Sequence, residues 1–271
     1  MSQESGGRAE TITANVALNL SGSPLRASIT VPTQVFELHD LLPTVRSLSE
    51  SIIGEAVKAE RAQGRSISCR SGCGACCRQI VPVSEVEARL IRDLVESLPE
   101  PRRSEVRARF ETAKVQLAES TLLATLRDPA GVTDDDLVPL ALEYFRQGIP
   151  CPFLENESCS IYEDRPVVCR EYLVTSPAEN CANPTPGSVR RVPLAAKVSS
   201  VLGRMGHDPA ADRGRWVPLI LALEWAAEHP DDQPRRTGPE WLRELFQHLT
   251  GKTIPAPGSS GADAKGPTAP V

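Results

Sequence analysis

The start of the chain alternates hydrophobic and polar residues on both sides of a short turn. Over residues 11–31 the segment TITANVALNL is followed by the turn SGSP and by LRASITV. A period of two residues is typical of a β-strand with one buried face, and it places Val16, Leu18 and Leu20 together. We therefore predict a β-hairpin that packs on the rest of the protein, because an isolated hairpin is only marginally stable.

Further along, hydrophobic residues recur at three- and four-residue steps, the spacing of amphipathic helices. The clearest run has Leu41, Val45, Leu48 and Ile52 on one stripe and stops at Gly64. The same spacing predicts helices over residues 35–63, 85–98, 100–127, 134–145, 192–205, 216–228 and 239–249. The segment Ser-Glu-Val-Glu before the second of these has the spacing of a capping box. The helix over 216–228 is hydrophobic nearly all round, so we expect it in the core.

The predicted fold class is mainly α, with a small N-terminal β-hairpin and an irregular, cysteine-rich centre. Residues 1–10 are polar, and Gly, Pro, Ala and Ser dominate residues 251–271, so neither end can build a core. We expect these two ends to be disordered. Residues 11–250 should form a single mostly helical domain, which contains the cysteine-rich module at 69–181.

Charge and hydropathy exclude several classes of partner. The chain has 271 residues, a net charge of −5 and no run of Lys or Arg, which argues against nucleic acid and anionic membranes. Its longest strongly hydrophobic run, residues 217–223, is far shorter than the roughly 18 residues that a membrane-spanning helix needs. The first residues, MSQESGGRAE, lack the basic and hydrophobic regions of a secretory signal. We expect a soluble protein of the reducing cytoplasm.

All eight cysteines lie in the middle of the chain, and their clustering is the main functional signal. The candidate metal ligands are Cys69, Cys73, Cys76, Cys77, Cys151, Cys159, Cys169 and Cys181. Disulfides, redox catalysis and metal binding are three explanations for such a cluster. A reducing compartment disfavours disulfides, whereas short gaps between cysteines let their sulfurs converge on one ion or cluster. Metal binding by thiolates is the better explanation.

The adjacent pair Cys76 and Cys77 favours more than one metal atom. Neighbouring side chains diverge in both strands and helices, so the two sulfurs cannot easily reach one ion. Two metal ions, or two irons of one cluster, remove that difficulty. Gly72 and Gly74 flank Cys73, and glycine lets a backbone approach a ligand closely. Amides of such a loop can also stabilise the charge of thiolate ligands.

Arginines and prolines accompany the second group of cysteines. Pro166 suits the first turn of a helix, which would place Cys169 near the positive helix end and lower its pKa. Arg165 and Arg170 are candidates for cofactor binding, because they could donate hydrogen bonds to cluster sulfurs. They could equally pair with the nearby acidic residues Glu163, Asp164 and Glu171.

The combination of GCGACC with CPFL and CSIYEDRPVVCREY resembles the CxxCxxCC, or YkgJ-like, cysteine-cluster family. The resemblance covers about residues 69–172, and it implies a zinc- or iron-chelating protein. The ligands that it implies are Cys73, Cys76, Cys77, Cys151, Cys159 and Cys169. Cys69 departs from the family pattern, because three residues rather than two separate it from Cys73, and Cys181 lies outside the motif. Relatives include proteins labelled iron–sulfur oxidoreductases and flagellin lysine methylases.

Several functions fit these observations. The first hypothesis is a cysteine-ligated iron–sulfur centre, of the [4Fe-4S] type, in a redox or metal-handling role. The second is a structural zinc module that acts through a protein partner. The third is an enzyme that modifies protein lysines, although no glycine-rich cofactor loop or acid–base constellation supports it. The spacing from Cys69 to Cys76 also occurs in radical S-adenosylmethionine enzymes, but these need successive βα units, whereas helices dominate here.

Overall fold

A computed structural model of the chain describes residues 10–20, 23–207, 215–231 and 233–252. The predicted disordered ends lie outside the described residues, except for Glu10, Gly251 and Lys252. Helices dominate, four pairs of strands are antiparallel, and the segments that carry the cysteines are short and irregular. The predicted fold class is therefore confirmed.

The first element is the predicted N-terminal hairpin. It consists of β1 (Thr11–Leu20) and β2 (Ser23–Pro32). The register pairs Thr11 with Pro32 and Val16 with Ala27. Val16 is half-buried against the core, as predicted, and Val31 of β2 is fully buried. The side chains of Leu18 and Leu20 lie outside the described part of the structure.

The long helix begins later than its hydrophobic spacing predicts. The segment predicted as one helix over 35–63 forms β3 (Val35–Glu37), the 3-10 turn η1 (Leu38–Leu41) and α1 (Leu42–Ala62). β3 pairs with β8 (Arg235–Thr237), and the indole N–H of Trp241 donates a hydrogen bond of 3.2 Å to the carbonyl of Phe36. Pairing with a distant strand overrides the local helical spacing.

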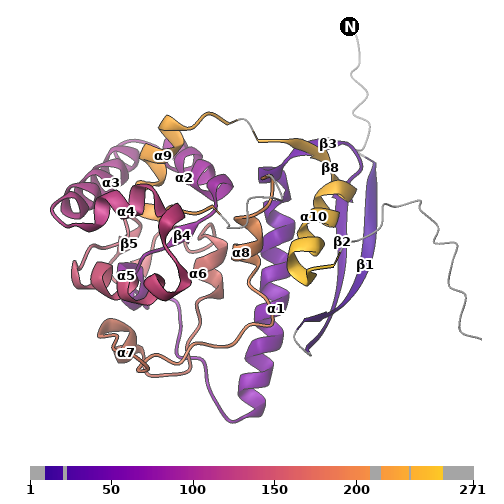
Figure 1. The fold of residues 1–271 in the computed structure, drawn as a ribbon, viewed down its shortest axis with the longest axis horizontal. Helices are drawn as coiled ribbons and strands as arrows, with labels where there is room; N and C mark the ends of the chain where they lie inside the picture. The colour runs from indigo at the N-terminus through magenta and orange to yellow at the C-terminus, as the bar shows by residue number, and fades with distance from the viewer. Residues whose placement is uncertain (1–9, 21–22, 208–214, 232, 253–271) are drawn as a thin grey trace, which may run out of the picture.

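The first hydrophobic core lies where the hairpin, α1, α8 (Val198–Leu202) and α10 (Gly238–Thr250) meet. Figure 1 shows α10 between the hairpin and α1. Only glycine fits at position 238, since a Cβ there would lie 2.2 Å from the carbonyl oxygen of Pro32. The predicted helix over 239–249 is confirmed, whereas that over 192–205 is reduced to the five residues of α8.

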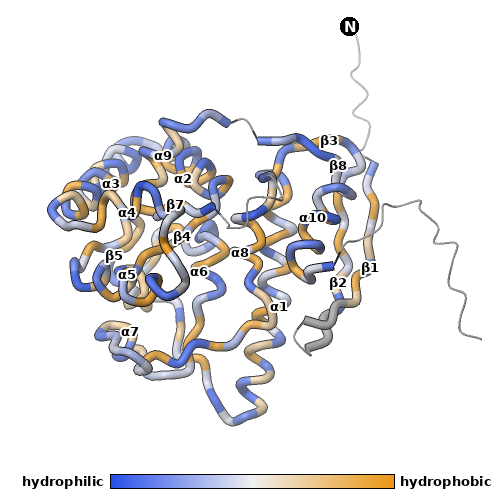
Figure 2. Tube along the Cα trace, viewed as in Figure 1, coloured by the Kyte–Doolittle hydropathy of each residue, from blue (hydrophilic) through white to orange (hydrophobic). Residues whose placement is uncertain are grey.

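The second half of the fold is a group of helices. It consists of β4 (Pro82–Val83), α2 (Glu85–Ser97), α3 (Arg102–Ala118), α4 (Leu122–Arg127), η3 (Pro129–Gly131) and α5 (Asp134–Arg146). The capping box predicted at Ser84 and Glu87 is present at the start of α2. Along α2 and α10, hydrophobic and hydrophilic residues alternate in Figure 2, as expected for helices that bury one face.

The single helix predicted over 100–127 is interrupted between α3 and α4. The hydroxyl of Ser120 donates a hydrogen bond of 2.7 Å to the carbonyl of Leu117, and it accepts one of 3.2 Å from the N–H of Leu122. Serine side chains compete in this way with the hydrogen bonds of a helix. The interruption lets Leu122 and Leu126 of α4 pack into a hydrophobic cluster with Tyr144 and Ile149.

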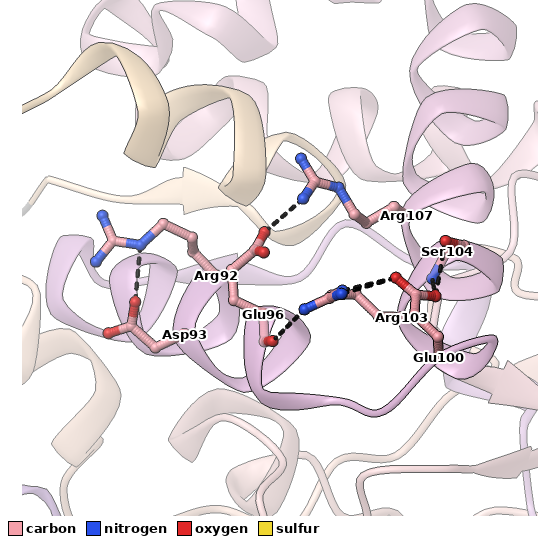
Figure 3. A network of polar contacts seen from close by, with 7 residues as sticks. All are labelled: Arg92, Asp93, Glu96, Glu100, Arg103, Ser104 and Arg107. Carbon is pink, nitrogen blue, oxygen red and sulfur yellow. Dashed lines mark hydrogen bonds and ion pairs between the residues drawn. The ribbon is translucent and has the colours of Figure 1, made fainter.

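Charged residues join α2 to α3 on the surface, as Figure 3 shows. Arg107 donates to Glu96 at 2.7 Å, and Arg103 donates to Glu100 at 2.9 Å. Glu100 also accepts from the hydroxyl and the N–H of Ser104. The side chains in this network are exposed or partly exposed, so it contributes little to stability.

The predicted core helix over 216–228 is also shorter than expected. It forms β7 (Val217–Pro218), η4 (Leu219–Leu221) and α9 (Ala222–Glu228). β7 pairs with β4, and the N–H of Leu219 donates a hydrogen bond of 2.9 Å to the carbonyl of Val81. Its residues are nevertheless largely buried, as the hydrophobic composition predicted.

The cysteine-rich segment packs mainly on the second half of the fold, and its helix α6 reaches the first half. Its elements are the 3-10 turn η2 (Ala75–Arg78), β5 (Leu154–Glu155), β6 (Ser158–Cys159), α6 (Val167–Glu171) and α7 (Ala178–Ala182). α6 contacts α1 and α8 on one side and β4 on the other (Figure 1). The antiparallel strand pairs of the described chain do not have the βα architecture that radical S-adenosylmethionine chemistry would need. None of the described helices has the length and hydrophobicity to cross a membrane.

Candidate metal centre

The two cysteine segments, far apart in sequence, meet in space. The N–H of Cys151 donates a hydrogen bond of 2.7 Å to the carbonyl of Cys77. The loop before η2 also packs tightly against the β5–β6 hairpin at Gly74. A Cβ at that position would lie 2.6 Å from Leu154 Cδ1 and 2.9 Å from the carbonyl oxygen of Glu157. Glycine is therefore required at position 74 for close approach rather than for backbone freedom.

Every cysteine is a free thiol in this structure. Cys181, in α7, is buried, and the other seven are half-buried. α7 packs on η2, which brings Cys181 to the first segment. Cys69 is held by backbone groups, since the N–H of Val174 donates to its sulfur at 3.3 Å. The chain thus gathers thiols from η2, β6, α6 and α7 into one region.

Cys76 lies at the centre of this region electrostatically. Negative charge on Cys76 raises the pKa of the thiols in both segments. The affected residues are Cys69, Cys77, Cys151, Cys159, Cys169 and Cys181. Because such interactions weaken with distance and screening, the Cys76 sulfur lies within electrostatic range of thiols in both segments.

The other thiols divide into two groups around Cys76. Cys69 and Cys181 are influenced by each other or by Cys73, and we name these three the first thiol group. The charges of Cys151 and Cys159 act on the remaining members of the cluster, including Cys77 and Cys169. The second thiol group comprises Cys77, Cys151, Cys159 and Cys169.

In this structure the sulfurs do not have the geometry of a coordination site. Across the described residues, no three or more Cys, His, Asp or Glu side chains are placed so that they could hold a metal ion. The donor set nevertheless fits a thiophilic metal, because free thiols from four elements share one region. Binding would require the sulfurs to draw together from the positions that they occupy here.

The pKa values of the adjacent thiols Cys76 and Cys77 shift in opposite directions. A hydrogen bond from the thiol of Cys77 lowers the pKa of Cys76 to about 7, and the charge of Arg165 contributes to the same shift. Donating that hydrogen bond, together with burial, raises the pKa of Cys77. At neutral pH, Cys76 is therefore the thiol most readily available as a thiolate nucleophile or ligand.

Burial keeps the deeper thiols protonated. It raises the pKa of Cys151 to about 12 and that of Cys181 to about 11. The predicted lowering of the Cys169 pKa is wrong: burial, with the charge of Cys151, raises it well above its usual range. Pro166 precedes α6 rather than lying within its first turn, and the short helix does not outweigh desolvation. Metal binding must displace these protons.

Arg165 faces the thiols from the second segment. Burial raises the pKa of Cys69 and Cys159, and the positive charge of Arg165 opposes that rise. The same charge contributes to the lowered pKa of Cys76. The guanidinium lies 3.8 Å from the ring centre of Tyr162, and its buried Nε has no hydrogen-bond partner in the described structure. Arg165 is thus placed to neutralise negative charge on the thiolates.

Arg170 has a different environment. It pairs with Glu50 of α1 at 2.8 Å, and it donates hydrogen bonds to the carbonyls of Arg165, at 3.1 Å, and Glu163. The acidic residue that it pairs with is therefore distant in sequence rather than one of its neighbours. Arg170 holds the backbone that carries Arg165.

Two buried carboxylates, which the sequence did not single out for the site, fix α6. Glu87 accepts a hydrogen bond of 2.8 Å from the N–H of Val167, while its other oxygen completes the capping box of α2. Glu171 accepts from the N–H groups of Val198 and Ser199 at the start of α8. The capping-box spacing identified Glu87 as a local cap, but no local signal indicated its second partner.

The four histidines form contacts outside the thiol region. His39 pairs with Glu37 and Asp40, and the imidazole of His229 stacks on Trp225. His207 and His248 approach Glu85 and Glu244, at 3.8 and 3.9 Å. The thiols are therefore the candidate donors of this region.

A known protein family matches the part of the chain that contains the cysteines. Residues 68–186 match the CxxCxxCC family, which is described as a "putative zinc- or iron-chelating domain". No curated protein and no solved structure matches the chain. The matched segment contains all eight cysteines, and its description supports metal binding. Residues 68–186 of this chain are therefore a domain of the CxxCxxCC family.

Proposed function

We propose that the thiol region holds an iron–sulfur centre, of the [4Fe-4S] type, and that the protein serves electron transfer or metal handling in the cytoplasm. The observation that carries this proposal is the position of Cys76, within electrostatic reach of both thiol groups and beside Cys77. The thiols of Cys76 and Cys77 share a hydrogen bond rather than diverging, and two neighbouring sulfurs can bind two metal atoms of one cluster. When bound, an iron–sulfur cluster supplies one-electron transfer.

The proposed ligands come from both segments. They are Cys73, Cys76, Cys77, Cys151, Cys159 and Cys169, with Cys69 and Cys181 as additional donors. Arg165 would stabilise the anionic thiolates, since its charge already favours the ionised forms of Cys69, Cys76 and Cys159. Arg170 would support the centre through the backbone of Arg165.

The segments on either side support this region as parts of one domain, residues 11–250. α6 carries Cys169 and packs between α1 and β4. The buried carboxylates Glu87 and Glu171 bind it to α2 and α8. A ligand on a short helix is positioned more exactly when buried hydrogen bonds fix that helix.

A zinc function is the second candidate, and the division of the thiols favours it. Adding Cys76 to the first thiol group gives four donors, Cys69, Cys73, Cys76 and Cys181. The second thiol group has four as well, and four thiolates are a usual structural zinc site. Two zinc ions would then join the segments, and the helical surface would bind a protein partner.

Anaerobic purification of the full chain tests these candidates. We expect brown protein with iron and acid-labile sulfide; colourless protein with about two zinc ions would favour the zinc module. Cys76→Ser should abolish most of the metal content, whereas Ser158→Ala, beside Cys159 in the same hairpin, should preserve it. Protein that takes up neither metal would refute both candidates. A binding shift with S-adenosylmethionine would instead support a methylase-like enzyme.

A further inference from the structure

A hollow of about 410 Å³ opens on the surface beside Cys73. This volume lies within the range of about 300–1,000 Å³ that is usual for small-molecule sites. The loop before η2 forms one wall of the hollow, and the β5–β6 turn and α7 form the other walls. The lining residues are Arg70, Gly72, Cys73, Gly74, Ala75, Arg78, Glu157 and Ala182.

The charges that line the hollow leave one positive charge without a counterion. Arg78 pairs with Glu157 through both nitrogens of its fork, at 2.6 and 3.0 Å. The Arg70 side chain is exposed, and its guanidinium has no hydrogen bond or ion pair to the residues that the structure describes. Since Cys73 is a thiol at the same surface, the hollow combines a free guanidinium with a metal-ligand candidate.

Glu157, the acidic residue of the hollow, lies in a strained turn. Asn156 and Glu157 form the turn between β5 and β6 with φ values of 49° and 57°. A two-residue turn of this kind favours glycine at its second position, and a residue with a side chain costs roughly 1–2 kcal/mol in the left-handed region. Glu157 occupies that position nonetheless, and its carboxylate fixes Arg78. Strain at a surface hollow is typical of a functional site.

We propose that this hollow binds a small organic anion, with a carboxylate or phosphate group paired to Arg70. Guanidinium groups recognise these oxyanions through two parallel hydrogen bonds. Gly72 leaves room for the body of the ligand, because nothing lies within 4 Å of a Cβ at that position. The inference rests on the proposed function in one respect: if Cys73 is a metal ligand, the bound anion covers the exposed side of the metal centre.

Titration calorimetry on the purified full chain tests this inference. Citrate and inorganic phosphate are the two probes, and glycerol is the uncharged control. We expect saturable binding of at least one anion and none of glycerol. Arg70→Ala should weaken binding about tenfold or more, as expected for loss of a charge-assisted hydrogen bond. Arg61→Ala removes an exposed arginine of α1 and should leave the affinity unchanged.

Alkylation gives a second readout that a folding defect does not mimic. In metal-free protein, citrate should slow the reaction of iodoacetamide with Cys73, and Arg70→Ala should remove that protection. Absence of saturable anion binding, or equal losses in the two arginine variants, would overturn the inference. Metal analysis of the same samples separates it from the proposed function: loaded protein that binds no anion refutes the hollow alone, and anion binding by protein that takes up no metal refutes the centre alone.

Discussion

The carboxylate of Glu87 in α2 accepts a hydrogen bond of 2.8 Å from the backbone N–H of Val167, two residues before Cys169. Glu87 is almost fully buried, so its oxygens have no water to replace a lost partner. One side chain thus caps α2 and holds the start of the helix that carries a proposed ligand.

Glu87→Ala should destabilise the protein by about 2–4 kcal/mol, because it removes a cap and leaves the N–H of Val167 unpaired. Metal content should fall in the same variant, since α6 loses its anchor. Urea unfolding and metal analysis measure the two effects. Glu119→Ala, an exposed carboxylate after α3, is the control, and equal stability of the two variants would contradict the role of Glu87.

Replacing Arg165 should weaken the metal centre without unfolding the protein. Arg165→Gln removes the charge that favours the ionised forms of three thiols, so metal affinity should fall roughly tenfold or more. Arg165→Lys keeps a positive charge and should retain more of the affinity. Competition with a chelator measures both. If the Gln and Lys variants lose metal alike, the charge is not what matters.

Gly74→Ala should separate the cysteine loop from the β5–β6 hairpin. Its new methyl group would lie 2.6 Å from Leu154 Cδ1 and 2.9 Å from a carbonyl oxygen, so we expect a loss of about 1–3 kcal/mol in unfolding free energy. Metal uptake should decrease too. Gly131→Ala is the matched control, because nothing lies within 4 Å of a Cβ there. Retention of full stability and metal by Gly74→Ala would disprove the close approach.

Acid should weaken the connection between α9 and the helices α3 and α4. Burial raises the pKa of Glu224, but hydrogen bonds from Arg127, at 2.9 Å, and Lys114 outweigh it, so the pKa is lowered. The ionised carboxylate is therefore favoured in the folded protein. Its stabilisation is complete above the unfolded pKa of about 4.3 and is lost as the pH falls through the lower folded pKa.

Glu224→Gln should accordingly destabilise the protein by about 1 kcal/mol at pH 7. The difference from the natural sequence should shrink as the pH falls below about 4. Urea unfolding at a series of pH values measures it. A difference that stays constant down to pH 3 would show that the ion pair is not its source.

Metal removal should loosen the cysteine-rich segments and spare the first hydrophobic core. That core is packed around Trp241 and Leu245, which are fully buried and belong to α10 rather than to the thiol region. Hydrogen exchange before and after chelation should therefore increase over residues 69–77 and 151–181 but not over α1 and α10. Uniform deprotection would instead indicate that the metal stabilises the whole fold.

Local signals predicted the elements that depend on neighbouring residues. The hairpin, α2 with its capping box, and α10 follow from periodicity and caps. The start of α1 was missed because Val35 to Glu37 form a strand with β8, a partner near the other end of the chain. The interruption after α3 arises from one hydroxyl, that of Ser120, whose choice of partner periodicity does not reveal.

By itself, the sequence determined the candidate donors: eight cysteines within residues 69–181, with residue types and spacing that identify a metal-binding domain. Only the tertiary structure decided that the charge of Cys76 acts on thiols of both groups, that Arg165 rather than Arg170 interacts with them, and that burial raises the pKa of Cys169. The physical reason is that donor chemistry belongs to a residue, whereas electrostatic proximity and desolvation depend on every segment that packs around it.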